Sequence, residues 1–331
     1  MATGEYIGLL DHDDLLPVVA LYEIVKEINK NREIDFIYTD EDKITDINNR
    51  FSPYFKPDFS PETLSVHNYI THFIAFKKSL LDEIAIPDYF DSRFDGAQDF
   101  DLILRLTEKA KCIKHIAKIL YHWRAGIGST ATVAEAKPYA YEAGKRAVEE
   151  HLKRIGRKGI VQNGQDIPGV YKINYEIIDN PKVSILIPNK DGIEYLKPCI
   201  NSILNLTTYE NYEIIVIENN SEKKSTFDYY EKIKQNPKIK VLYYSNIKEN
   251  KTEFNYSKII NFGVKNCDGD FILQLNNDTK LITEDWLEQF IGYAQFEEIG
   301  AVGARLYYKD KSIQHAGIAI GIGGTARKFT Y

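Results

Sequence analysis

One short pattern occurs twice in this chain and limits what the chain can fold into. The first copy, residues 4–14, reads Gly-Glu-Tyr-Ile-Gly-Leu-Leu-Asp-His-Asp-Asp. The second copy, residues 269–279, reads Gly-Asp-Phe-Ile-Leu-Gln-Leu-Asn-Asn-Asp-Thr. Both have glycine, an acidic residue, an aromatic residue and isoleucine, and then apolar residues that lead into a polar turn. A hydrophobic strand that ends in carboxylates is typical of the ligand-binding edge of an open α/β sheet.

The polar turns are candidate cation sites. Mg²⁺ binds one or two carboxylates and completes its coordination with phosphate oxygens and water. Asp11 and Asp13 could supply such ligands in the first copy, and Asp278, which matches Asp13, could do so in the second. The alternative is a solvated Asp-rich turn, which commonly follows a strand. Two copies in similar contexts favour a metal and phosphate role.

The composition is that of an ordinary globular protein, with 44% hydrophobic and 27% charged residues. The net charge of −6, without a local basic patch, excludes a nucleic-acid partner. No apolar run is long enough for a transmembrane segment, and no export signal begins the sequence, so we expect a cytoplasmic protein. Cys112, Cys199 and Cys267 are far apart, which favours reduced thiols over a disulfide or a zinc site.

The first half of the chain contains two further polar clusters. A strand from residue 35 to 38 runs into Thr39-Asp40-Glu41-Asp42. This acidic run could face an active site, but we expect it to be a solvated strand end. A later strand, residues 112–120, is followed by Tyr121, His122, Trp123 and Arg124 and then by a glycine-containing stretch at 126–130. Histidine, indole and guanidinium groups could bind a metal, a sugar face and a phosphate. A packed strand end is the commoner role of such a cluster.

A helix is predicted to begin near Asp99, in the run 94–106. Asp99 could be its N-cap, with Asp101 and Arg105 paired one turn apart. Alternatively, a carboxylate at this position is kept ionised by the helix dipole, as a general base requires. These residues by themselves favour the cap.

The second half repeats a β-α-β pattern from Lys182 onward, after a helix at 138–155. The strand ends at 187–191, 217–221 and 275–278 should lie side by side at one sheet edge. No Gly-x-Gly-x-x-Gly motif follows the first of these strands, and no Walker lysine loop is present. A dinucleotide-binding Rossmann site and a P-loop are therefore disfavoured.

Together these motifs resemble the family 2 glycosyltransferases with a GT-A fold, in the tandem form found in bacterial polysaccharide and rhamnan-type assembly proteins. Residues 183–191 resemble the family's opening strand and nucleotide loop, and residues 218–221 resemble the loop that reads the nucleotide base. Both polar turns resemble the metal-binding DXD motif. Residues 96–99 resemble the segment of the catalytic base, and residues 122–124 resemble the motif that closes the acceptor half.

The resemblance implies an α/β fold, with mostly parallel sheet and flanking helices, in two incomplete copies. Residues 1–156 would be the acceptor-side half of a first domain, 157–181 a linker, and 182–331 the nucleotide-binding half of a second. The first copy lacks nucleotide loops, and the second ends before any base. Since the chain also begins directly with a strand, we expect it to be a fragment.

The implied reaction is inverting transfer of a sugar from a nucleotide-sugar donor to a glycan or lipid-linked glycan acceptor, in the cytoplasm or at the inner face of the membrane. Asp99 would be the catalytic base. Mg²⁺ or Mn²⁺ would be bound by Asp11, Asp13 and Asp278, with His122 as an additional ligand. The nucleotide sugar would contact Pro188, Asn189, Asp191, Glu218, Asn219 and Asn276, and the acceptor or phosphate would contact Trp123 and Arg124.

Other classes of protein remain open. A non-catalytic nucleotide- or sugar-binding fragment is possible because neither copy is complete. A metal phosphohydrolase would use the acidic turns but would give the segment around Asp99 no role. A purely structural repeat protein would leave the matched turns unexplained.

Overall fold

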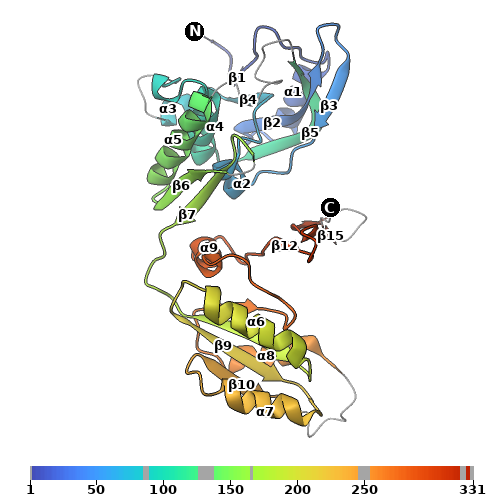
Figure 1. Cartoon of the computed structure of the whole chain (residues 1–331). Helices are drawn as coiled ribbons and strands as arrows, with labels where there is room; N and C mark the ends of the chain where they lie inside the picture. Colours follow the sequence, from blue (N-terminus) through green and yellow to red (C-terminus); the bar gives the residue numbers. More distant parts are fainter. Residues whose placement is uncertain are drawn as a thin grey trace. The chain divides into compact units, whose positions relative to one another are not determined.

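The computed structural model describes residues 2–84, 89–125, 138–164, 167–244, 254–320 and 326–328. The chain divides into two compact α/β units, Met1–Asn174 and Tyr175–Tyr331 (Figure 1). The division falls inside the segment 157–181. That segment also contains β6 (Gly159–Asn163) and β7 (Tyr171–Tyr175), which form a two-stranded sheet. The glycine-containing stretch at 126–130 lies outside the described residues.

The sheet of the first unit is built around β2 (Phe36–Ile44). β5 (Ile113–Arg124) runs parallel to β2 along its length. β4 (Ile74–Lys77) pairs antiparallel with the first part of β2, and β3 (Arg50–Tyr54) pairs antiparallel with the second part. β1 (Tyr6–Gly8) pairs antiparallel with β4, which places the strand that precedes the first acidic turn at the sheet edge.

Helices cover this sheet because their apolar residues recur with helical spacing. α1 (Ala20–Lys30) buries Ala20, Ile24 and Ile28 against strand residues such as Ile37. α4 (Gln98–Lys109) and α5 (Pro138–Arg154) pack against each other. The shorter helices are α2 (Pro61–Val66), α3 (Leu80–Glu83) and the 3₁₀ turn η1 (Ser92–Phe94).

The second unit has a parallel sheet in the order β10-β9-β8-β11. The strands are β8 (Val183–Asn189), β9 (Tyr212–Glu218), β10 (Ile239–Tyr243) and β11 (Phe271–Gln274). All three pairings are parallel, so the strand ends that follow residues 187, 217 and 274 meet at one edge, and this prediction is confirmed. Both faces of the central strands are covered, which explains their nearly continuous apolar sequences.

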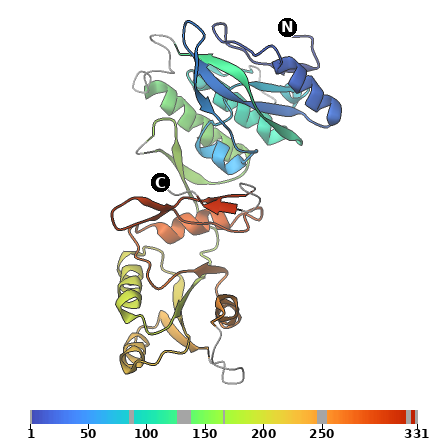
Figure 2. The ribbon, with the colours of Figure 1, turned by 90° about the vertical axis from the view of Figure 1, so that its right-hand side faces the viewer.

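The two faces of this sheet carry different helices, as Figure 2 shows. α6 (Ile193–Leu206), α7 (Lys224–Ile233) and α9 (Trp286–Ala294) pack on the face that contains Ile185 and Val216. α8 (Tyr256–Lys265) packs on the opposite face. Two short strand pairs follow: β12 (Leu306–Tyr307) with β13 (Ile313–His315), and β14 (Ile318–Ile320) with β15 (Ala326–Lys328). No helix in the described ranges is both long and apolar enough to span a bilayer.

The prediction that residues 40–42 form a solvated strand end is wrong. β2 continues through them, and Asp40, Glu41 and Asp42 are only 2%, 6% and 3% exposed. Buried carboxylates need partners, because burial of an unpaired charge is costly. Each of the three faces a histidine: the pairs are Asp40 with His115, Glu41 with His72, and Asp42 with His122.

Candidate active site

The first acidic turn is fixed to β5 by Asp14. This carboxylate is buried and accepts hydrogen bonds from the Tyr121 hydroxyl and, at 2.7 Å, from the backbone N–H of Arg124. Arg124 Nε also donates to the carbonyl oxygen of Asp13, at 2.7 Å. Asp11 and Asp13, by contrast, are exposed. Asp14 therefore holds the turn in place, and the other two carboxylates remain available to a ligand.

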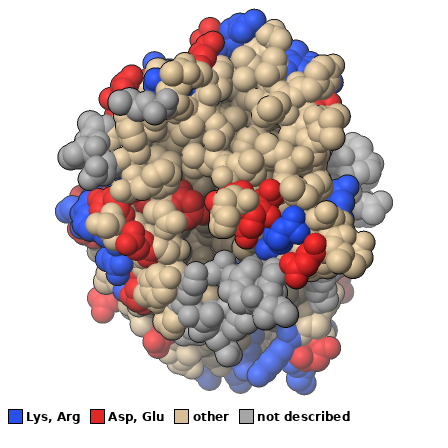
Figure 3. All heavy atoms as spheres, turned by 90° about the horizontal axis from the view of Figure 1, so that it is seen from above, with Lys and Arg blue, Asp and Glu red and all other residues tan. Residues whose placement is uncertain are grey.

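On the face that Figure 3 shows, acidic side chains gather along the middle beside a hollow, and a broad neighbouring area carries few charges. Exposed carboxylate oxygens in a turn are hard ligands of the kind that Mg²⁺ and Mn²⁺ prefer. Within the part of the chain that the structure describes, no three His, Cys, Asp or Glu residues lie close enough to form a complete metal site. Asp11 and Asp13 are thus two exposed carboxylates of one turn, and a cation there would need further ligands from phosphate and water.

Asp99 lies in the first turn of α4, behind Ala97 at the N-cap position, so the prediction that Asp99 is the cap is wrong. Its Oδ2 accepts a hydrogen bond from Asn68 Nδ2 at 3.1 Å. The residue is half-buried, yet enough protein surrounds the carboxyl group that burial raises its pKa. The charge of His72 opposes this rise in pKa, and the charge of Asp11 adds to it. Asn68 thus fixes one oxygen of a carboxyl group whose pKa burial raises.

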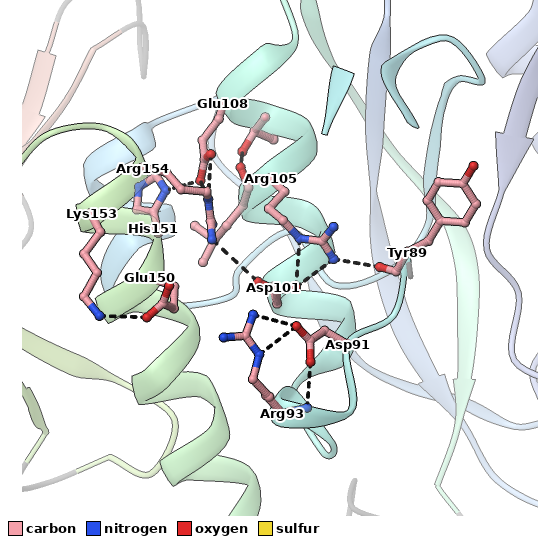
Figure 4. A network of polar contacts seen from close by, with 12 residues as sticks. Tyr89, Asp91, Arg93, Asp101, Arg105, Glu108, Glu150, His151, Lys153 and Arg154 are labelled. Atoms are coloured by element: carbon pink, nitrogen blue, oxygen red, sulfur yellow. Dashed lines mark hydrogen bonds and ion pairs between the residues drawn. The ribbon is translucent and has the colours of Figure 1, made fainter. Parts of the chain in front are cut away.

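A buried ion pair lies within α4, the helix that carries Asp99 (Figure 4). Asp101 and Arg105 are each 1% exposed, and Arg105 Nη2 lies 2.7 Å from Asp101 Oδ2, which confirms the predicted pair. Arg105 also donates to the carbonyl oxygen of Tyr89. A second contact joins α4 to α5, where Glu108 accepts hydrogen bonds from Arg154 and contacts His151. These contacts hold α4, and with it the first turn.

The cluster at the end of β5 makes contacts within the first unit. His122 Nδ1 lies 2.5 Å from Asp42 Oδ1, which leaves Nε2 as the ring nitrogen for any other ligand. Trp123 has Lys43 Nζ 5.1 Å from its ring centroid. Arg124 donates to the side-chain oxygen of Asn48, in addition to its contacts with the acidic turn.

At the edge of the second sheet, four side chains form a continuous chain of hydrogen bonds. Asn277 Nδ2 donates to Asn189 Oδ1, and Asn189 Nδ2 donates to the Tyr230 hydroxyl, both at 2.7 Å. The Tyr230 hydroxyl donates to Glu218 Oε2 at 2.6 Å. Burial and the neighbouring Glu218 raise the pKa of Tyr230. The chain connects the ends of β11, β8 and β9. Tyr230 was not predicted as part of the site, because it comes from α7 and its sequence context is that of an ordinary core residue.

Asp191 organises the loop before α7. Its backbone is in the left-handed region, with φ of 53°, and its carboxylate accepts backbone N–H groups from Glu222 and Lys223. The hydrogen bond from Lys223 is the main cause that lowers the pKa of Asp191. In the same loop, Ser221 donates to Glu218 Oε2 at 2.6 Å. Asp191 and Glu218 therefore use much of their hydrogen-bonding capacity inside the protein.

The remaining predicted residues of this edge differ in exposure. Asn276 and Asp278 are exposed, Pro188 is half-buried, and Asn219 is buried. Cys199 lies beneath this edge, with Sγ 3.8 Å from the carbonyl oxygen of Asn276. Burial, with a contribution from the charge of Asp278, raises the pKa of Cys199 to about 12, so this thiol is unreactive.

A family model described as Glycosyl transferase family 2 matches residues 1–85 and 184–319, which is more than half of the chain. The chain belongs to this family. Its fold is accordingly a GT-A-like arrangement of sheets with flanking helices, and the protein is a glycosyltransferase by family.

Curated relatives match almost the entire chain. An uncharacterized protein, y4gI, of Sinorhizobium fredii is 41% identical over 98% of this chain and 35% of its own length. The O-antigen biosynthesis protein RfbC of Myxococcus xanthus is 35% identical over 98% of this chain and 24% of its own length. The glycosyltransferase described here thus spans only about a third or a quarter of those proteins.

Solved structures are more distant. A structure of S. aureus TarS 1-349 is 21% identical, with a TM-score of 0.29, over 34% of this chain and 32% of that one. The mannosyltransferase PcManGT from Pyrobaculum calidifontis, in complex with GDP-Man and Mn²⁺, is 12% identical, with a TM-score of 0.32, over 50% of this chain and 44% of that one.

For this family 2 glycosyltransferase, the structure distributes the predicted residues between the two units. Asp11, Asp13, Asp99 and the 122–124 cluster lie in the first unit, and the predicted nucleotide residues with Asp278 lie in the second. Sequence reasoning assigned no role to Asn68, which donates a hydrogen bond to Asp99, or to His72, whose charge lowers the Asp99 pKa. In the sequence these two residues appear only as polar positions after a short helix, which is a weak indication of a functional site.

Proposed function

We propose that this chain takes part in inverting, metal-dependent transfer of a sugar from a nucleotide-sugar donor to a glycan or lipid-linked glycan acceptor. One observation carries the proposal: the loop of residues 67–73 connects Asp99 with the exposed acidic turn. Asn68 of this loop donates a hydrogen bond to Asp99. His72 of the same loop stacks on Tyr121, whose hydroxyl fastens the turn through Asp14. An in-line displacement at a sugar needs a base on one side of the anomeric carbon and charge stabilisation of the leaving diphosphate on the other.

Asp99 acts as the general base. Its carboxylate accepts the proton of an acceptor hydroxyl, and that oxygen attacks the anomeric carbon opposite the departing diphosphate, which inverts its configuration. The raised pKa supports this role, because a carboxylate with a higher pKa is a stronger proton acceptor.

Asp11 and Asp13 hold the cation side of the site, with His122 Nε2 as an additional ligand. A bound Mg²⁺ or Mn²⁺ supplies charge neutralisation for the leaving diphosphate. Trp123 and Arg124 lie next to His122 on β5 and contact the acceptor or a phosphate. The connection between Arg124 and the Asp13 carbonyl supports this grouping.

The second unit contributes the nucleotide-binding half. Pro188, Asn189, Asp191, Glu218, Asn219 and Asn276 form its nucleotide-sugar site, and Asp278 binds the cation. Their position at the carboxyl edge of a parallel sheet supports this, since open α/β sheets bind ligands there. Asp191 and Glu218 act mainly by shaping the loop, because their oxygens already accept hydrogen bonds from residues 221–223.

We infer that the two units correspond to complementary halves of two copies of one domain. β1 and β11 occupy equivalent places in the repeated pattern. Among the described residues, β1 pairs with β4 and β11 pairs with β8. In this view the first unit supplies the segment of Asp99 and the second unit supplies the nucleotide loops, each beside its own copy of the acidic turn. The separate family matches at 1–85 and 184–319 support this inference.

Titration of the chain with UDP, GDP and dTDP, with and without Mn²⁺, tests the nucleotide and metal roles by calorimetry. We expect at least one nucleotide to bind in a Mn²⁺-dependent way, and Asp278→Asn to weaken that binding. A parallel assay with the corresponding nucleotide sugars measures turnover. Binding without turnover in a protein that contains both complete flanking halves would favour the non-catalytic alternative. Binding that ignores both Mn²⁺ and Asp278 contradicts the metal assignment.

A further inference from the structure

The loop between α2 and β4, residues 67–73, reaches the proposed base. Asn68 Nδ2 donates to Asp99 Oδ2 at 3.1 Å, and Asn68 Oδ1 accepts the backbone N–H of Thr71 at 3.3 Å. The oxygen of the Asn68 amide thus bonds to its own loop, and its nitrogen bonds to the Asp99 carboxylate. An amide fixed at both ends restricts rotation of the carboxylate that it contacts.

His72 comes from the same loop and is held on two sides. Its ring stacks on Tyr121, with centroids 4.7 Å apart and planes 10° from parallel, and lies 5.5 Å from the ring of Trp123. Its Nδ1 is 3.4 Å from Glu41 Oε2. Its side chain is 22% exposed, and no residue in the described part of the chain makes a hydrogen bond to Nε2.

Glu41 is a buried centre that fastens this loop to β2. Its Oε2 accepts hydrogen bonds from Lys56 Nζ at 3.0 Å, from Thr71 Oγ1 at 2.9 Å and from the backbone N–H of His72 at 3.2 Å. Lys56 also donates to the carbonyl oxygens of Ile70 and His72. Polar groups of Ile70, Thr71 and His72 are therefore all directed toward the pair formed by Glu41 and Lys56.

The charges of this cluster favour an ionised Asp99. Burial acts to raise the pKa of Glu41, but His72 and Lys56 hold it at about 2, so Glu41 is ionised at neutral pH. Burial acts to lower the pKa of His72, but Glu41 and Asp99 raise it overall. A positive charge on His72 opposes the protonation of Asp99 that burial and Asp11 would promote.

We propose that Asn68 and His72 are positioning residues for Asp99, with Glu41 holding His72 in place. This inference rests on the proposed role of Asp99 as the base. Asn68 fixes one carboxylate oxygen and leaves the other for the acceptor hydroxyl. His72 lies in the same loop as Asn68, held by Tyr121 and Glu41, and when charged it opposes the protonation of Asp99. Without Asn68 the Asp99 carboxylate would be free to rotate, and without either residue it would protonate more readily.

The charged groups that face this cluster come from several elements. Asp99 is faced by His72 of the loop and by Asp11 of the acidic turn, and it acts in turn on Tyr171 of β7. His72 is faced by Glu41 of β2, by Lys56 of the segment after β3 and by Asp99 itself. A test must therefore change one charge at a time.

Carbon-13 NMR of the aspartate carboxyl groups in the complete 331-residue chain provides the test. We compare the Asp99 pKa in the wild type, Asn68→Ala and His72→Asn. We expect the Asp99 pKa to rise by about half a pH unit or more in Asn68→Ala, which loses one hydrogen bond to a charged group. We expect it to rise also in His72→Asn, which loses the charge that lowers it. The matched control is His115→Asn. His115 pairs with Asp40, the neighbour of Glu41 on β2, and its replacement should leave the Asp99 pKa unchanged.

The reciprocal measurement covers the case in which a loop variant fails to fold. Asp99→Asn should lower the His72 pKa, because coupling between two sites is mutual. An Asp99 pKa that is equal in the wild type and both folded loop variants, or a His72 pKa that ignores Asp99→Asn, overturns the inference. Transfer assays on the same variants, in a protein that contains both complete flanking halves, separate the two proposals. If the Asp99 and His72 pKa values are coupled but Asp99→Asn keeps full activity, the base assignment is wrong and the coupling remains.

Discussion

The Tyr121 hydroxyl donates a hydrogen bond to the Asp14 carboxylate, and this contact fastens the acidic turn to β5. Both residues are buried, although 107 positions separate them in the sequence. The same turn presents Asp11 and Asp13 outward. The positions of these proposed metal ligands therefore depend on Asp14, which is not proposed to bind the metal. The division of roles between Asp13 and Asp14 leads to the first prediction.

Asp14→Asn should lower the stability of the protein, whereas Asp13→Asn should lower its binding of Mn²⁺. Asp14 is 7% exposed and accepts two hydrogen bonds, so its replacement should lower the free energy of unfolding by about 1–3 kcal/mol. The Asp13 side chain is 52% exposed, and its replacement should leave stability unchanged but weaken Mn²⁺ binding, because the first turn loses a ligand while Asp278 is retained. Urea unfolding and Mn²⁺ titration measure the two effects. Equal Mn²⁺ affinity in the wild type and Asp13→Asn contradicts the proposed ligand.

Tyr121→Phe should loosen the turn without changing any charge. The phenylalanine ring can keep the stacking on His72, while Asp14 loses a hydrogen-bond donor. We expect a loss of about 1–3 kcal/mol of stability and weaker Mn²⁺ binding. Tyr195→Phe is the matched control, because Tyr195 is 56% exposed and should tolerate the change. A Tyr121→Phe protein with wild-type stability would show that the hydroxyl contact does not hold the turn.

The sequence predicted the β-α-β half well because each of its elements has a local signal. The runs at 183–189 and 212–218 are apolar on both faces, and the chain returns to the same sheet edge after each helix. The positions of Asn189 and Glu218 followed from this topology. The roles of Asp99 and the two polar turns in transfer remain predictions.

Other features depend on contacts between distant residues, which a sequence pattern does not encode. Residues 40–42 have the composition of a solvated run, but they are buried because histidines and basic residues from four other segments reach them. Asp14 is indistinguishable from Asp13 in the sequence. Asp14 has a structural role because Tyr121, from a distant part of the chain, donates a hydrogen bond to it. Local periodicity predicts the backbone, whereas the pairing of buried charges depends on the complete fold.

The stabilising contribution of Glu41 should depend on pH. Its pKa in the folded protein is about 2, below the value of 4.5 for an ordinary glutamate, so the unfolded chain binds the proton more readily. The contribution is therefore complete above about pH 5 and is lost as the pH falls from there toward 2. The free energy of unfolding of the wild type should exceed that of Glu41→Gln by about 3 kcal/mol at pH 7.

The measurement for Glu41 is a pair of urea unfolding series at pH 7, 5 and 3.5. The difference between wild type and Glu41→Gln should shrink at the lowest pH. The wild type must be compared with Glu41→Gln at each pH, because other carboxylates also titrate in this range and affect both proteins. A difference that stays constant between pH 7 and 3.5 contradicts the low pKa of Glu41.

Tyr230→Phe should break the hydrogen-bond chain at the proposed nucleotide-binding edge of the second sheet. The Tyr230 hydroxyl links Asn189 to Glu218, and both of these side chains are buried, so its removal leaves each of them one hydrogen bond short. We expect a loss of about 1–3 kcal/mol in stability, together with weaker Mn²⁺-dependent binding of nucleotide diphosphate. Tyr229→Phe, at the next position of α7, is the matched control, and calorimetry with UDP, GDP and dTDP gives the affinities. If Tyr230→Phe loses stability but binds nucleotide as tightly as the control does, the hydrogen-bond chain supports the fold of this edge and takes no part in forming its binding site.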